Sequence, residues 1–87
     1  MKSNMITIYS SDYCPWCDKA KTLLNSVGLK YQEMILNKDY TKDDLRELLP
    51  ENIRLTVPQV FIYNKRVGGY EDLAAYLENH NIMGIQQ

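Results

Sequence analysis

Two cysteines three positions apart, Cys14 and Cys17, restrict the possible folds of this chain more than any other feature, and the chain has no further cysteine. They stand between an apolar, β-branched run and a segment with helical periodicity. A disulfide over so short a loop restricts little of the unfolded chain, so the pair is a poor structural staple. A structural zinc site needs a second pair of ligands, and the single His80 does not supply one. The spacing therefore favours a redox-active pair, with no metal site.

The pattern around the cysteines predicts a βαβ unit. Met5–Tyr9 is a short apolar run typical of a buried strand, and Tyr31–Leu36 is predicted to be a second strand. Between them, Pro15 suits the first position of a helix and Gly28 suits its end. One face of that helix carries the apolar positions Cys17, Ala20, Leu23, Leu24 and Val27. A right-handed crossover would make the two strands parallel.

A second helix is predicted between Thr41 and Pro50. Thr41 is a favourable N-cap, and acidic residues follow it in the first turn, where the helix dipole favours them. Leu45, Leu48 and Leu49 are predicted to form its inward face. Pro50 is expected to end the helix because proline cannot continue it.

The last third of the chain is predicted to add a hairpin and a helix. Val60–Tyr63 and Arg66–Gly68 are predicted strands, with Asn64-Lys65 as the turn. A helix is expected from Glu71, with Leu73, Tyr76, Leu77 and His80 on one face. The predicted order is βαβαββα, which makes an α/β fold with a mixed sheet and helices on both of its faces.

The composition is that of one globular domain. The chain has 87 residues, 45% hydrophobic and 24% charged, and we expect a single domain over 1–87 with a core at about 5–78 and an unpatterned tail at 81–87. Ten basic and eleven acidic side chains give a net charge of −1, which argues against nucleic-acid binding. No apolar run approaches the ~18–20 residues of a membrane span, so no membrane association is expected. A secretory signal is not expected either.

The two cysteines are predicted to differ in reactivity. Cys14 is expected to be the N-cap of the first helix, where unpaired N–H groups and the helix dipole stabilise a thiolate. It is therefore the predicted nucleophile. Cys17 lies one turn later on the apolar face, so we expect it to be partly buried and to act as the resolving thiol.

Three motifs in order resemble those of the dithiol glutaredoxins. Cys14-Pro15-Trp16-Cys17 is similar to their Cys-Pro-Tyr-Cys site, with tryptophan for tyrosine. Thr56-Val57-Pro58 resembles their Thr-Val-Pro loop, and Gly68-Gly69-Tyr70-Glu71-Asp72-Leu73 resembles their Gly-Gly-x-x-Asp-Leu segment. The resemblance spans about residues 5–78 and implies a thioredoxin-like fold, in which three helices flank a four-stranded mixed sheet.

The resemblance also implies a glutathione site. Pro58 would be cis and would hold the Val57 backbone beside Cys14, where it pairs with the cysteine of glutathione. The N–H groups of Glu71 and Asp72 would bind the γ-glutamyl carboxylate, and the Asp72 carboxylate the ammonium. Arg54 would bind the glycine carboxylate. The full implied set is Tyr13, Pro15, Trp16, Arg54, Thr56, Val57, Pro58, Gly69, Tyr70, Glu71 and Asp72.

Two positions depart from the family pattern. Many members carry a lysine three residues before the first cysteine, where this chain has Ser11. The substitution removes a cation that would help to bind glutathione and to stabilise the thiolate. Tyr70 stands where many members have cysteine or serine, which is a smaller change.

The resemblance implies a glutathione-dependent thiol–disulfide oxidoreductase that reduces protein disulfides and glutathionylated proteins. Glutathione would be a co-substrate, and no cofactor would be tightly bound. A monomer in the cytoplasm is expected, with partners that include ribonucleotide reductase in this family. One alternative is a glutaredoxin-like electron donor reduced by thioredoxin reductase, which Ser11 leaves open. Another is a dimeric [2Fe–2S] cluster carrier, which Pro15 disfavours.

Overall fold

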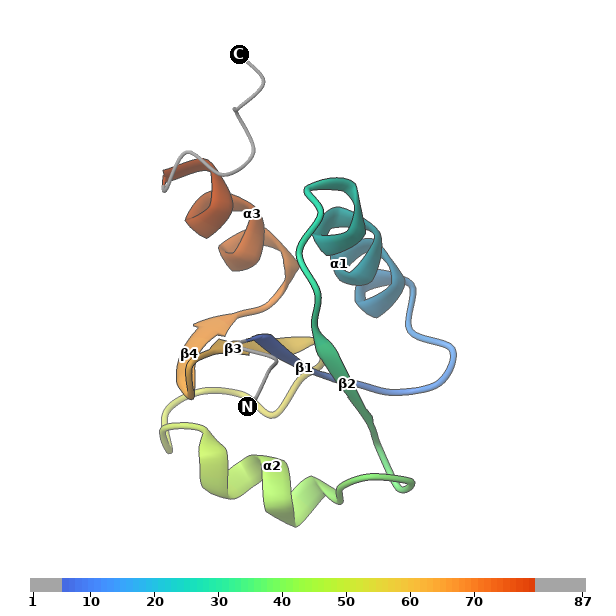
Figure 1. The fold of residues 1–87 in the computed structure, drawn as a ribbon. Coiled ribbons are helices and arrows are strands. Elements are labelled where there is room, and N and C mark those ends of the chain that lie inside the picture. The colour runs from blue at the N-terminus through green and yellow to red at the C-terminus, as the bar shows by residue number, and fades with distance from the viewer. Residues whose placement is uncertain (1–5, 80–87) are drawn as a thin grey trace.

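A computed structural model describes residues 6–79, which form a four-stranded sheet and three helices (Figure 1). The elements are β1 (Ile6–Ser10), α1 (Pro15–Ser26), β2 (Gln32–Ile35), α2 (Lys42–Leu48), β3 (Gln59–Ile62), β4 (Lys65–Gly68) and α3 (Tyr70–Asn79). The strand order is β2-β1-β3-β4, with β1 and β2 parallel and the other pairs antiparallel. The predicted element order and mixed sheet are confirmed. His80 and the predicted tail at 81–87 lie outside the described residues.

The helices divide the interior into two cores, one on each face of the sheet. Helices α1 and α3 cover one face and α2 covers the other (Figure 1). Because side chains alternate along a strand, neighbouring residues of β3 enter different cores. The core under α1 and α3 consists of Ile6, Ile8, Ala20, Leu24, Val60, Leu73 and Leu77. The core under α2 consists of Tyr40, Leu45, Leu49 and Phe61.

Helix α2 begins as predicted but ends differently. The Thr41 hydroxyl accepts from the Asp44 N–H, and the Asp44 carboxylate accepts from the Thr41 N–H, which forms a capping box. The helix ends at Leu48, and Leu49 is extended with φ −108° and ψ 148°. This change of direction turns Leu49 into the core and leaves Leu48 45% exposed. The prediction that Leu48 faces inward was wrong.

The hairpin turn lies one residue earlier than predicted. Ile62 of β3 pairs with Lys65 of β4, so Tyr63 and Asn64 form the two-residue turn rather than Asn64 and Lys65. Both turn residues have positive φ, 51° and 66°. Turns of this kind need positive φ at both central positions, which asparagine tolerates well and tyrosine rarely adopts. The pairing of β3 with β4 sets the turn here against the preference of Tyr63.

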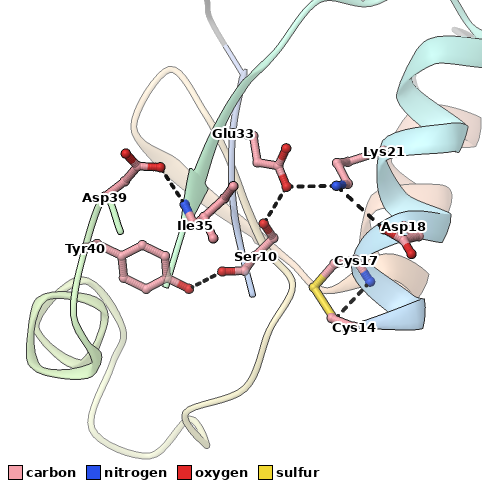
Figure 2. A network of polar contacts seen from close by, with 9 residues as sticks. All are labelled: Ser10, Cys14, Cys17, Asp18, Lys21, Glu33, Ile35, Asp39 and Tyr40. Atoms are coloured by element: carbon pink, nitrogen blue, oxygen red, sulfur yellow. Dashed lines mark hydrogen bonds and ion pairs between the residues drawn. A yellow bond between two sulfur atoms is a disulfide. The ribbon is translucent and has the colours of Figure 1, made fainter. Parts of the chain in front are cut away.

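A polar network ties the end of β1 to β2, to α1 and to the segment that precedes α2 (Figure 2). The fully buried Ser10 donates its hydroxyl to Glu33 of β2 at 2.7 Å, and Lys21 of α1 donates to the same carboxylate oxygen at 2.8 Å. On the other side, the carbonyl of Ser10 accepts from the Tyr40 hydroxyl at 2.8 Å. Burial, with a smaller effect of Tyr9, raises the pKa of Tyr40 to about 12, so its hydroxyl stays a donor at neutral pH. Ser10 is thereby held just before the segment that leads to the cysteines.

We expect Glu33→Gln to lower the free energy of unfolding by about 1 kcal/mol at pH 7. Burial alone would raise the pKa of Glu33, but the hydrogen bonds from Lys21 and Ser10 outweigh it and lower this pKa below 4.5. A lowered carboxyl pKa stabilises the fold above the unfolded-state pKa, and this stabilisation is lost as the pH falls through the folded-state pKa. The difference between wild type and variant should therefore shrink when urea unfolding is repeated at decreasing pH below about 4.

The control for this prediction is Asp18→Asn. Asp18 also faces Lys21, at 3.6 Å, but its side chain is largely exposed. Exposed pairs contribute little, so this variant should change the stability by less than about 0.5 kcal/mol. Equal effects of the two substitutions would show that the partly buried hydrogen bonds of Glu33 contribute nothing specific.

Candidate active site

Cys14 and Cys17 are joined by a disulfide at the start of α1, with their Cα atoms 5.2 Å apart (Figure 2). Cys14 is the N-cap, with extended backbone angles, and Pro15 occupies the first turn. The N–H of Cys17 donates to Sγ of Cys14 at 3.1 Å. The predicted N-cap is confirmed. After reduction, this N–H and the helix dipole favour a thiolate at Cys14 over a thiol.

The two sulfurs differ in accessibility. Cys14 is half-buried, whereas Cys17 is only 1% exposed and lies on the buried face of α1 with Ala20 and Leu24. A partner in solution therefore reaches Cys14 first. This geometry is the one that the predicted nucleophile and resolving thiol require.

The segment Thr56-Val57-Pro58 lies beside Cys14. The peptide bond between Val57 and Pro58 is cis, as the resemblance implied. The carbonyl oxygen of Val57 is 4.0 Å from Sγ of Cys14. The Val57 backbone is therefore adjacent to the redox centre although 43 positions separate the two residues.

A groove of about 500 Å³ extends from this point and brings together most of the predicted glutathione-binding residues. Tyr13 and Pro15 do not line it, and the side chain of Tyr13 is fully exposed. The predicted residues that do line it are Trp16, Arg54, Thr56, Val57, Pro58, Gly69, Tyr70, Glu71 and Asp72. Four further lining residues were not predicted from the sequence: Asn52, Ile53, Gln59 and Arg66.

Trp16 forms an aromatic wall of the groove together with Tyr70. Trp16 is 49% exposed, and the two ring centroids are 5.7 Å apart. Lys19 lies with Nζ 4.5 Å from the centroid of the Trp16 ring, a cation–π contact that the sequence reading missed. The spacing of three residues on a helix was the available signal.

The carboxylate of Asp72 lies at the start of α3. Its Oδ2 accepts from the N–H of Gly69 at 3.3 Å, so the carboxylate caps its own helix. Gly68 precedes this turn with φ +125°, a conformation that residues with a side chain rarely adopt. The exposed N-terminus of α3 faces the groove with its positive dipole end and is suited to an anion.

Asn52, Ile53 and Arg54 of the loop 50–54 line a further part of the groove, and Arg46 of α2 fastens this loop. The guanidinium of Arg46 donates to the carbonyl of Pro50 at 2.6 Å and to that of Ile53 at 2.8 Å. Both bonds span the end of α2 and fix the loop directly before Arg54. Arg46 therefore positions a wall of the groove without lining it.

Within residues 6–79, no three His, Cys, Asp or Glu side chains are grouped so that they could hold a metal ion. None of the helices in this part of the chain is long and apolar enough to cross a membrane.

Comparison with known proteins identifies relatives of this chain in sequence and in structure. Residues 6–67 match the family model of the glutaredoxins. The chain is 45% identical over 71 residues to the hybrid peroxiredoxin hyPrx5 of Haemophilus influenzae, which covers 82% of this chain and 28% of that protein's length. It is 39% identical over 70 residues to glutaredoxin 3 of Escherichia coli K12, covering 80% and 82% of the two chains. The buckwheat glutaredoxin–glutathione complex superposes with a TM-score of 0.75 at 25% identity, covering 93% of this chain and 74% of that one.

The thioredoxin-like fold and the cysteine pair at the start of α1 define a thiol–disulfide oxidoreductase. The chain belongs to the glutaredoxin family.

Proposed function

We propose that this protein uses glutathione as its electron donor and reduces glutathionylated proteins and protein disulfides. The observation that carries the proposal is the groove beside Cys14, which gathers residues from α1, the Val57–Pro58 segment and the start of α3. A related protein of the same fold forms a complex with glutathione. The expected setting is a reducing cytoplasm, where the family's potentials of roughly −200 to −230 mV favour reduction of substrates.

On a glutathionylated protein, the Cys14 thiolate attacks the sulfur of glutathione. The disulfide between the substrate and glutathione breaks, the substrate leaves as a thiolate, and a disulfide forms between Cys14 and glutathione. The thiolate of a second glutathione then attacks the glutathione sulfur of this mixed disulfide. Glutathione disulfide leaves, and Cys14 is restored as a thiolate.

On a protein disulfide, both cysteines take part. Cys14 attacks one substrate sulfur and forms a mixed disulfide with the protein, while the other substrate sulfur leaves as a thiolate. Cys17 then attacks Sγ of Cys14, which releases the reduced substrate and forms the Cys14–Cys17 disulfide seen in the structure. Two molecules of glutathione reduce this disulfide and leave as glutathione disulfide.

In the groove, three polar parts of glutathione have a candidate partner: the cysteine backbone, the γ-glutamyl carboxylate and the ammonium. The N–H and C=O of Val57 would pair with the cysteine backbone of glutathione, next to Cys14. The N-terminus of α3 would bind the γ-glutamyl carboxylate. Asp72 would bind the ammonium in addition to capping Gly69.

Ser11 leaves open one competing function, in which thioredoxin reductase supplies the electrons. The experiment compares two reducing systems with a glutathionylated substrate and NADPH: glutathione with glutathione reductase, and thioredoxin reductase alone. We expect turnover with the first system and none with the second. Turnover with thioredoxin reductase alone would reject glutathione as the donor.

A further inference from the structure

Arg66 is a cation of the groove to which neither the family motifs nor the reaction above assigns a role. It lies on β4 opposite Phe61 and is half-buried. Its side chain lines the same groove as Arg54 and the start of α3. Its Nε donates to Oε1 of Gln59 at 3.1 Å.

Gln59 holds the guanidinium in place. It is only 2% exposed, and both ends of its amide are engaged. Oε1 accepts from Arg66, and Nε2 donates to Oγ1 of Thr56 at 3.3 Å. A buried amide that is bonded at both its oxygen and its nitrogen has one favourable orientation, so it fixes Nε of Arg66 and leaves the terminal nitrogens to bind a ligand.

Among the described residues 6–79, the charge of Arg66 lacks a carboxylate partner. The ion pairs recorded among residues 6–79 join Lys21 to Asp18 and to Glu33, so neither Arg66 nor Arg54 belongs to one within that range. A half-buried guanidinium that lacks a counter-ion on the wall of a groove is suited to a ligand carboxylate, which it can bind with two parallel hydrogen bonds.

Resting on the function proposed above, we propose that Arg66, oriented by Gln59, binds the glycine carboxylate of glutathione together with Arg54. Glutathione carries two carboxylates, and the N-terminus of α3 accommodates one of them. The other, the glycine carboxylate, is bound by the guanidinium groups of Arg54 and Arg66. Arg66 thereby supplies the groove with the second cation that Ser11 does not provide.

The test uses the Cys17→Ser background, in which Cys14 forms a stable mixed disulfide. Its equilibrium constant is measured with glutathione disulfide and, separately, with the uncharged bis(2-hydroxyethyl) disulfide. We expect Arg66→Met to lower the constant for glutathione about tenfold and to leave the constant for the uncharged disulfide unchanged. Arg66→Lys should restore part of the loss, because it keeps the charge without the planar fork.

Lys65→Met is the matched control, because Lys65 is the neighbouring cation on β4 but is exposed and does not line the groove. It should leave both constants unchanged, and thermal unfolding checks that every variant is folded. An equal loss with both disulfides, or no loss with glutathione, would overturn the proposal.

The glycine assignment is tested with glutathione disulfide whose glycine carboxylates are converted to amides. The difference between wild type and Arg66→Met should then disappear, and a persisting tenfold difference would overturn the assignment. The equilibrium needs no reductase, so it reports on Arg66 even if the turnover assay fails. If the turnover assay fails, a lower constant for glutathione disulfide in Arg66→Met, with an unchanged constant for the uncharged disulfide, would still support the role of Arg66.

Discussion

Cys14→Ser is expected to abolish turnover of glutathionylated substrates, with a loss of at least about a thousandfold, whereas Cys17→Ser retains this activity within a few-fold. The reason is the position of the two sulfurs. Cys14 is the accessible N-cap whose sulfur already accepts the Cys17 N–H, so it is the thiolate that the substrate meets. Cys17 is buried and is not needed when free glutathione resolves the intermediate.

The same two variants should separate the two classes of substrate. With a protein disulfide in place of a glutathionylated protein, Cys17→Ser should lose its activity as well, because no buried thiolate is left to release the mixed disulfide. Both activities are measured with glutathione, NADPH and glutathione reductase. Retained activity of Cys14→Ser on either substrate would contradict the assignment of the nucleophile.

Gly68→Ala is expected to lower the free energy of unfolding by about 3 kcal/mol. Gly68 has φ +125°, where a side chain is strained, and an added Cβ would overlap the Asp72 carboxylate. Relief of the overlap requires Asp72 to move, which breaks its bond to the Gly69 N–H and the cap of α3. Urea unfolding followed by circular dichroism measures the change.

Gly69→Ala provides the control for this prediction. Here the added Cβ would lie 3.5 Å from the carbonyl of Pro58, which is an ordinary contact, and φ is not positive. The stability should change by less than about 1 kcal/mol. Equal losses in the free energy of unfolding for the two variants would contradict the prediction that the backbone conformation at position 68 requires glycine.

Patterns that are local in the sequence predicted the parts of the fold that depend on local physics. The helical spacing around Leu24 and the cap at Thr41 were confirmed, because each depends on neighbours within one or two turns. Leu48 was misplaced because the backbone leaves the helix directly after it. The turn at Tyr63 was missed because sheet pairing, not turn preference, decides its position.

The groove residues also separate into those that were predicted from the sequence and those that were missed. Its motif residues were found through the resemblance, and the structure brings Val57 and the start of α3 to one place near Cys14. Gln59 and Arg66 were missed because their hydrogen bond crosses a hairpin whose register the sequence did not reveal. The bond between Lys21 and Glu33 joins a helix to an edge strand and likewise depends on tertiary packing.

The depth of Cys17 in the protein has a consequence for the order of events. Because Cys17 is only 1% exposed, a molecule in solution does not reach its sulfur directly, and the first reaction partner of this sulfur is Sγ of Cys14 in its mixed disulfide with a substrate. On the route that uses both cysteines, a protein bound to Cys14 is therefore released by reversal of the first attack or after Cys17 has attacked Sγ of Cys14. The packing of α1 against the sheet thus protects the second thiol from competing reagents, so that Cys14 is the first sulfur to react on either route.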